Sequence, residues 1–345
     1  MALQFILGPS GAGKSEYIYE DIIRRTMQDE RENVIVLVPE QYSLEIQRKL
    51  VQKHPRGGSF QIDVIGFNRL AYRIFDELHI KPKKVLEDFG KSMLLRKAAQ
   101  EHKEELSLYA GSLDKAGFID EAKSLMSEIY QYDIPRERLR EALQKLDDSE
   151  EARVLARKLQ DMLVIFDAFE EKKGQAFIVA EQMLELLTAA AEQSEMIAGS
   201  EIVLDGFTGF TPIQLNLISV LLRRAKKVTI VLTIDAATYE KKHVAEHELF
   251  ALTKQTIEHL LLTAEQAHVV VKTALLLGKD GCKRWSKGHP LAHLEQNLFR
   301  YPYRVGKDEE QAITITAYDT PAQELTGVAE QIRTLVMEQG LSLIH

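Results

Sequence analysis

The feature that most constrains this chain is a glycine-rich octapeptide near its start, Gly8-Pro9-Ser10-Gly11-Ala12-Gly13-Lys14-Ser15. It matches the pattern G-x-x-x-x-G-K-[ST] in full, between an apolar run at residues 3–7 and a helix-like stretch at residues 16–25. Glycines let successive backbone N–H groups turn toward one anion at a helix N-terminus, so this order predicts a phosphate-binding loop. We expect all eight residues to bind ATP, with Lys14 on the β- and γ-phosphates and the Ser15 hydroxyl on Mg²⁺.

The rest of the chain alternates between two patterns. Continuous apolar runs at residues 33–39, 60–65, 201–204 and 228–234 are typical of strands that are buried on both faces of a parallel sheet. Helical patterns follow these runs, which predicts an α/β doubly wound fold. Between about residues 85 and 190, apolar side chains recur only at helical spacing, with charged residues between them. This stretch predicts an all-helical insertion.

These patterns divide the chain into consecutive parts. Residues 1–84 are expected to form the first half of the α/β domain, residues 85–190 the insertion, and residues 191–305 the second half. A strand at 312–317 and a helix at 321–339 follow, and residues 340–345 begin a further element. The chain stops there without a closing strand, which predicts that a longer protein has been truncated.

Composition excludes several classes of protein. The net charge of −8 and the pI near 5.8 disfavour general attraction to nucleic acid, so any DNA contact must come from local sites or from a partner. The sequence predicts neither a membrane span nor a basic leader, which indicates a cytoplasmic protein.

One cysteine, Cys282, excludes an internal disulfide and a multi-cysteine metal site within the chain. His289 and His293 lie four residues apart, but no third ligand is near and Pro290 is expected to start a helix between them.

A phosphate loop needs an acidic residue at the end of a neighbouring strand to hold Mg²⁺, and Asp205 is the candidate. Asp205 is also compatible with a simple turn or a strand-end cap. In active motors of this kind the next residue is a glutamate that activates water, whereas here it is Gly206. We therefore expect nucleotide binding with slow or absent hydrolysis, and Gly206→Glu is expected to gain ATPase activity. No catalytic residue is assigned beyond Asp205, and nothing in the sequence places Glu40 as a substitute base.

Several segments, in order, resemble the N-terminal part of the AddB family, one of the two subunits of the bacterial AddAB ATP-dependent helicase and deoxyribonuclease. The generic part is the phosphate loop with the residues before it, and the Asp-Gly-Phe-Thr and Leu-Glu-x-x-Leu-Phe segments are more specific. The matching segments are Phe5-Ile6-Leu7-Gly8 with the loop, Leu37-Val38-Pro39-Glu40-Gln41, Phe67-Asn68-Arg69-Leu70-Ala71, Leu204-Asp205-Gly206-Phe207-Thr208-Gly209-Phe210-Thr211-Pro212, and His293-Leu294-Glu295-Gln296-Asn297-Leu298-Phe299.

The resemblance implies a RecA-like, UvrD-like motor domain with a helical insertion, and residues 306–345 as the start of a second motor-like domain. It also implies that the complete AddB-type protein pairs with AddA as a heterodimer, acts on double-strand DNA ends in recombinational repair, and takes part in recognising the Chi sequence. The family's C-terminal nuclease domain with its [4Fe-4S] cluster has no counterpart in this chain. The fragment is therefore expected to lack nuclease activity and a cluster.

Family members bind DNA along a face formed by motor loops. At the matching positions the candidates are Gln41, Phe67 as a stacking surface, and Arg69 as a phosphate contact. For Phe67 and Leu70, burial in the core is an equally good interpretation.

Three functions remain open from the sequence. The chain is an ATP-binding part of a helicase–nuclease, or a non-catalytic scaffold in which ATP stabilises one arrangement for binding DNA and AddA, or a phosphotransferase acting on a small molecule. The long insertion and the lack of an arginine-rich lid disfavour the third. Gly206 favours the scaffold over an independent motor.

Overall fold

The computed structural model of the chain describes residues 1–115, 117–147, 149–174, 176–278, 281–286, 288–309 and 311–342. The chain forms two compact units, Met1–Arg284 and Trp285–His345. The first contains the central sheet and the insertion. The division into four parts that the sequence suggests stays a prediction.

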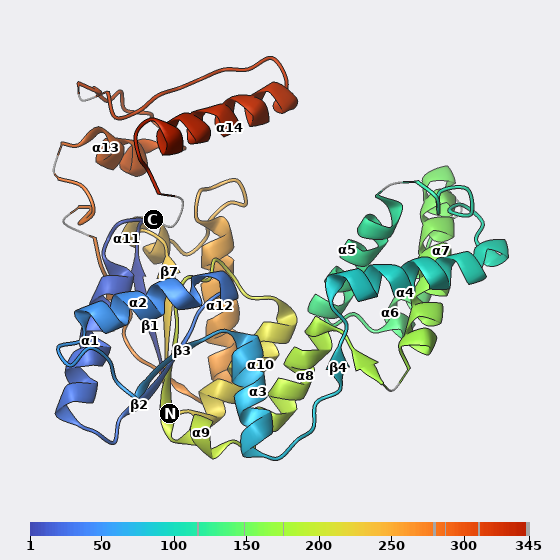
Figure 1. Cartoon of the computed structure of the whole chain (residues 1–345), viewed down its shortest axis with the longest axis horizontal. Helices are drawn as coiled ribbons and strands as arrows, with labels where there is room; N and C mark the ends of the chain where they lie inside the picture. The colour runs from blue at the N-terminus through green and yellow to red at the C-terminus, as the bar shows by residue number, and fades with distance from the viewer. Residues whose placement is uncertain are drawn as a thin grey trace. The chain divides into compact units, whose positions relative to one another are not determined.

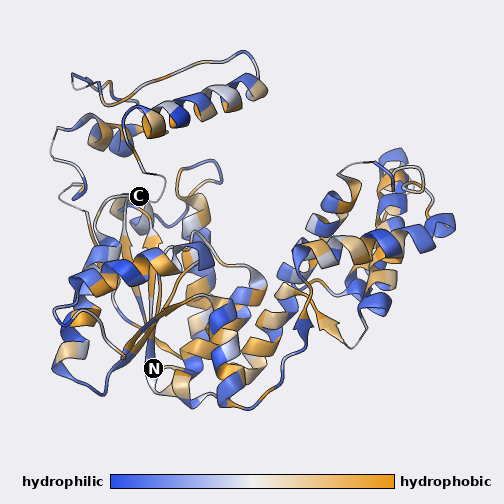
Figure 2. Ribbon diagram, in the orientation of Figure 1, coloured by the Kyte–Doolittle hydropathy of each residue, from blue (hydrophilic) through white to orange (hydrophobic). Residues whose placement is uncertain are grey.

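The first unit is built on a parallel sheet, with seven strands in the described residues (Figure 1). The strand order is β3-β2-β6-β7-β1-β8, and β9 also pairs with β1. All of these pairs are parallel, which confirms the predicted α/β class. Most strand residues are hydrophobic because helices cover both faces of the sheet (Figure 2). The strands are β1 Ala2–Gly8, β2 Asn33–Leu37, β3 Ile62–Ile65, β6 Ser200–Leu204, β7 Lys227–Thr233, β8 Val270–Val271 and β9 Leu275–Leu276.

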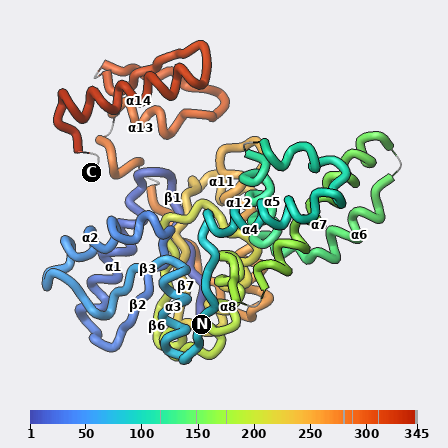
Figure 3. The backbone as a smooth tube through the Cα atoms, turned by 45° about the vertical axis from the view of Figure 1, so that its right-hand side comes forward, coloured from blue at the N-terminus to red at the C-terminus, as the bar shows by residue number. Residues whose placement is uncertain are grey.

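Helices pack on both faces of the sheet, as Figures 1 and 3 show. Successive residues of a strand point to opposite faces, so Phe5 packs in one hydrophobic cluster and Ile6 in the other. The cluster around Ile6 is covered by α1 Lys14–Gln28 and α2 Ser43–Lys53. The larger cluster is covered by α3 Phe67–Glu77, α8 Ala180–Ala191, α10 Pro212–Arg224 and α12 Ala251–Gln266. Short connecting helices are η1 Glu40–Tyr42, α9 Glu195–Ala198 and α11 Ala236–Glu240.

The predicted helical insertion is confirmed, and it has a hydrophobic core of its own. A small parallel pair of strands, which the sequence did not indicate, lies where the chain enters and leaves it. Buried Asp161 accepts hydrogen bonds from the backbone N–H groups of Ser107, Leu108 and Tyr109, at 2.7–2.8 Å. Burial opposes ionisation, but these bonds hold the Asp161 pKa below its usual value. The elements are β4 Lys84–Val85, α4 Asp88–Glu101, η2 Lys103–Glu105, α5 Phe118–Gln131, α6 Arg136–Gln144, α7 Glu150–Lys173 and β5 Phe177–Ile178.

The second unit contains the helices α13 Pro290–Asn297 and α14 Pro321–Met337. The predicted strand at 312–317 is wrong, because these residues pair with no strand in the described part of the chain and a strand needs a hydrogen-bonded neighbour. Of the further element expected at 340–345, residues 343–345 lie outside the described residues.

Pro290 starts α13 as expected, and the His289 ring accepts a hydrogen bond from the Leu291 N–H at the helix start. Among the described residues, no group of three or more histidine, cysteine, aspartate or glutamate side chains could hold a metal ion. None of the helices described is both long and apolar enough to cross a membrane.

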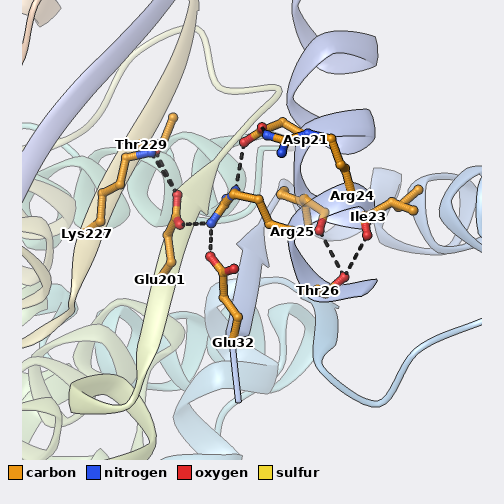
Figure 4. A network of polar contacts seen from close by, with 10 residues as sticks. Asp21, Ile23, Arg24, Arg25, Thr26, Glu32, Glu201, Lys227 and Thr229 are labelled. Carbon is orange, nitrogen blue, oxygen red and sulfur yellow. Dashed lines mark hydrogen bonds and ion pairs between the residues drawn. The ribbon is translucent and has the colours of Figure 1, made fainter. Parts of the chain in front are cut away.

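A network of charged residues joins the C-terminal end of α1 to the side of the sheet where the strands begin, which we call the amino edge (Figure 4). Arg25 donates to Glu201 on β6 at 2.7 Å and to Asp21 at 2.8 Å, and it also pairs with Glu32. Lys227, the first residue of β7, lies 3.2 Å from Glu201, which is buried. The C-terminal end of α1 is thus held at the amino edge. Its N-terminal end follows the end of β1, on the side of the sheet where the strands end, which we call the carboxyl edge.

Candidate phosphate-binding site

The phosphate loop lies between β1 and α1, as the sequence predicts. Gly11 and Gly13 have φ angles of 71° and 81°, in the left-handed region that favours glycine. Gly13 is the N-cap of α1, so the loop opens onto the N-terminal N–H groups of that helix. The Lys14 Nζ donates to the carbonyl oxygens of Gly8 and Pro9, both at 2.9 Å, which holds its side chain across the loop.

A segment from the end of the first unit packs against this loop. The backbone N–H groups of Lys283 and Arg284 donate to the Gly11 carbonyl at 2.9 Å and 3.2 Å. At Gly278, a Cβ atom would lie only 2.9 Å from Ala12 Cβ, so the close approach requires glycine there. Sequence reasoning missed these contacts, because the partners lie some 270 residues apart and no local motif links them.

Asp205 directly follows β6 and is 4% exposed. The expected neighbouring strand needs correction, because β7 lies between β6 and the strand that leads into the phosphate loop. The Asp205 carboxylate nevertheless reaches the helix that begins at the loop, since its Oδ2 accepts a hydrogen bond of 2.6 Å from the hydroxyl of Tyr19 on α1. Asp205 is thus on the α1 side of the sheet, the side that also carries Ser15.

The residues present fit a magnesium ion by the chemistry of their donors. A carboxylate and a hydroxyl are the hard oxygen ligands that Mg²⁺ takes from a protein when phosphates supply others. Asp205 accepts a hydrogen bond from Tyr19, which follows Ser15 by four residues on the same face of α1. These two side chains would hold the ion beside a bound triphosphate.

Two features bear on hydrolysis. Gly206 has a φ of 82°, so its backbone adopts a conformation that a glutamate rarely takes. The Glu40 carboxylate accepts a hydrogen bond of 3.0 Å from the Asn68 N–H at the start of α3, and it fills the space where a side chain at position 66 would lie. Glu40 therefore stabilises a helix terminus, and Gly206 is required by the turn after β6.

The three candidate DNA contacts differ in exposure. Gln41 and Arg69 are exposed, whereas Phe67 is 9% exposed and belongs to the main hydrophobic cluster. Its ring centre lies 5.4 Å from that of Phe207, and Phe207 lies 5.3 Å from Phe210. This contact favours the core interpretation of Phe67. The aromatic residues after Asp205, which sequence reasoning did not select as site residues, are part of the same cluster.

A cavity of about 360 Å³ lies beside this aromatic cluster. It is lined by the end of β2, the start of α3, the segment after β6 and α8, with Pro39, Asn68, Phe207 and Gln214 among the lining residues. In parallel sheets ligands bind at the carboxyl ends of the strands, so this cavity and the phosphate loop occupy the functional edge of the sheet.

Comparison with known proteins gives one consistent family. The family model described as "ADDB, N-terminal" matches residues 5–295. The chain is 37% identical over 343 residues to the B subunit of the ATP-dependent helicase/deoxyribonuclease of Lachnoclostridium phytofermentans, covering 98% of this chain and 30% of that protein. The protein of the same name from Clostridium kluyveri is 32% identical over 342 residues, covering 99% of this chain and 29% of its own length. The chain thus spans about 30% of the length of the relatives that it matches.

Proposed function

Because the chain belongs to the AddB N-terminal family, we propose that it is the nucleotide-binding part of the AddB-type subunit of an AddAB-type ATP-dependent helicase–nuclease. In this proposal it binds ATP with Mg²⁺ and hydrolyses the nucleotide slowly or not at all. The observation that carries the proposal is the complete phosphate loop at the start of α1, with Lys14 held across it and Asp205 linked to the same helix through Tyr19.

Each residue has a distinct role in this proposal. The N–H groups from Gly11 to Ser15 bind the phosphates, and the Lys14 ammonium neutralises the β- and γ-phosphates. A magnesium ion held by Ser15 and Asp205 would neutralise charge on the phosphate oxygens. The turn at Gly206 leaves no general base next to Asp205, which agrees with binding rather than turnover.

The complete AddB-type protein is proposed to act on double-strand DNA ends together with AddA, in keeping with the name of its relatives. Exposed Gln41 and Arg69 are the proposed DNA contacts within this chain, with Phe67 supporting them from the core. The nuclease chemistry and the [4Fe-4S] cluster are assigned to the part of the relatives that this chain does not span.

A second function is favoured by the same turn. The backbone at position 206 favours glycine, so the turn supplies no glutamate to activate water. Bound ATP would then stabilise one conformation of the protein instead of driving movement by hydrolysis. The chain would then be an ATP-gated scaffold for DNA and AddA within the larger enzyme. No feature of the described site favours a small-molecule phosphotransferase.

The test is the melting temperature of the wild-type chain and of Lys14→Ala, each with and without Mg²⁺-ATP. Saturating ligand is expected to stabilise the wild type by several degrees and the variant much less, because ligand binding stabilises the folded state by mass action. Lys97→Ala is the matched control, since Lys97 is an exposed lysine that pairs with Glu101 on α4, within the helical insertion. Equal shifts in the wild type and Lys14→Ala would refute the phosphate-binding role.

A further inference from the structure

Tyr19 occupies an unusual place for a buried tyrosine. It lies on α1, is 3% exposed, and packs in the hydrophobic cluster between α1 and the sheet. Its hydroxyl donates to the Asp205 Oδ2 at 2.6 Å. A tyrosine and a carboxylate 186 residues apart in sequence are thereby joined beneath the phosphate loop.

Tyr19 also shares a helix face with a residue of the phosphate loop. It follows Ser15 by four residues on α1, so the two side chains lie on the same face of the helix. Tyr19 therefore joins the helix face that carries Ser15 to Asp205, and these are the two side chains assigned to magnesium.

The direction of the hydrogen bond to Asp205 follows from the chemistry of the two groups. The phenol O–H donates, and the carboxylate oxygen accepts at 2.6 Å. A hydroxyl buried among apolar residues needs a hydrogen-bond partner, and a backbone carbonyl could serve. Here the partner is instead the Asp205 carboxylate, which belongs to the candidate site.

We propose that Tyr19 is a positioning residue for the magnesium–nucleotide complex. Its hydroxyl orients the Asp205 carboxylate toward the ion that Ser15 would also bind. The inference rests on the proposed ATP-binding function. An ionised carboxylate can accept several hydrogen bonds, so one bond from Tyr19 fixes its rotation and leaves acceptor capacity for the ion and its water. Partners that hydrogen-bond to metal ligands typically contribute about 10- to 100-fold to metal affinity.

The experiment uses Tyr19→Phe, which removes only the hydroxyl and keeps the ring in the core. Binding of a fluorescent ATP analogue is measured over a Mg²⁺ titration and in EDTA, with melting of the unliganded protein as the check on folding. The variant is expected to need about 10- to 100-fold more Mg²⁺ for half-maximal enhancement of binding. Its affinity in EDTA is expected to match that of the wild type, because the phosphate loop is unchanged. Tyr17→Phe is the matched control, since Tyr17 is exposed on the same helix.

A double-mutant cycle separates positioning from a general effect on the core. If Tyr19 acts through Asp205, the Mg²⁺ dependence of Tyr19→Phe/Asp205→Asn equals that of Asp205→Asn alone. Additive effects would overturn the inference, as would a Tyr19→Phe protein with wild-type Mg²⁺ dependence, while ATP binding itself would stand. No binding by the wild type with or without Mg²⁺ would overturn the proposed function as well.

Discussion

The two edges of the central sheet use charged residues in different ways, although one helix, α1, contributes to both. At the amino edge, Arg25 is surrounded by Asp21, Glu32 and Glu201, so charges that folding buries are neutralised within the chain (Figure 4). At the carboxyl edge, buried Asp205 accepts from a neutral phenol, and Lys14 donates to the backbone carbonyls of its own loop.

The difference separates charges that stabilise the fold from those that the proposed nucleotide site would use. A buried carboxylate is costly unless it is paired, and Glu201 has Arg25 and Lys227 as partners. Asp205 has no salt bridge among the described residues and accepts from the Tyr19 hydroxyl, and carboxylate oxygens are ligands that Mg²⁺ takes from proteins. We therefore expect substitutions at the amino edge to change stability, and those at the carboxyl edge to change ligand binding.

The largest effect is expected at Arg25. Arg25→Met removes one cation from a largely buried network and leaves Glu201 with Lys227, which should reduce the free energy of unfolding by about 1.5–3 kcal/mol. Urea denaturation measures this loss, and nucleotide affinity of the folded protein should stay unchanged. The control Arg24→Met concerns an exposed side chain that pairs with Asp21. A small loss at Arg25, equal to that at Arg24, would contradict the contrast between the edges.

An intermediate effect is expected at Gly206. The sequence alone suggests that Gly206→Glu restores a catalytic base, but the φ of 82° predicts strain of about 1–2 kcal/mol and no gain in ATPase activity. Steady-state phosphate release measures activity, and thermal unfolding measures the strain. Gly206→Ala, which introduces the strain without the carboxylate, serves as the control. Brisk turnover by Gly206→Glu would show that the turn can adapt and would restore the simpler interpretation.

The smallest effect is expected at Asp21. Burial opposes its ionisation, but hydrogen bonds from Arg24 and Arg25 hold its pKa below the usual value. A lowered pKa stabilises the fold above the unfolded-state pKa, and this contribution is lost as the pH falls through the folded-state value. Because the Asp21 side chain is partly exposed, Asp21→Asn should lower the free energy of unfolding by at most about 1 kcal/mol near neutral pH.

The pH dependence makes this prediction specific. The difference between Asp21→Asn and the wild type should be constant from about pH 5 to pH 7 and should shrink below about pH 4. Urea denaturation at a series of pH values measures it, with Glu20→Gln on the exposed face of α1 as the control. A difference that grows in acid would have the wrong sign for a lowered pKa.

Sequence patterns predicted the elements that depend on neighbouring residues. The octapeptide at Gly8 to Ser15 predicted its own conformation, because a G-x-x-x-x-G-K-[ST] loop needs positive φ angles at fixed positions. The apolar runs predicted the buried strands, and helical spacing predicted the insertion. The run at residues 312–317 predicted a strand wrongly, since an apolar pattern indicates a strand only where a partner strand lies beside it.

Contacts between distant residues could not be predicted in this way. The sequence indicated Asp205 and the strand at residues 228–234. It indicated neither that this strand lies between β6 and β1 nor that the Tyr19 hydroxyl donates to Asp205. Similarly, the turn after Asp205 places Phe207 against Phe67, and this contact favours a core role for a residue first considered as a DNA contact.

By itself the sequence determined that this chain contains a phosphate loop, a parallel α/β sheet and a helical insertion, because spacing and apolar periodicity act over a few residues. Only the tertiary structure decided which carboxylate meets the loop helix, which glycine conformations block a glutamate, and which charges are neutralised by the fold. These depend on strand order and on side chains brought together across the whole chain. Local patterns contain no record of such contacts.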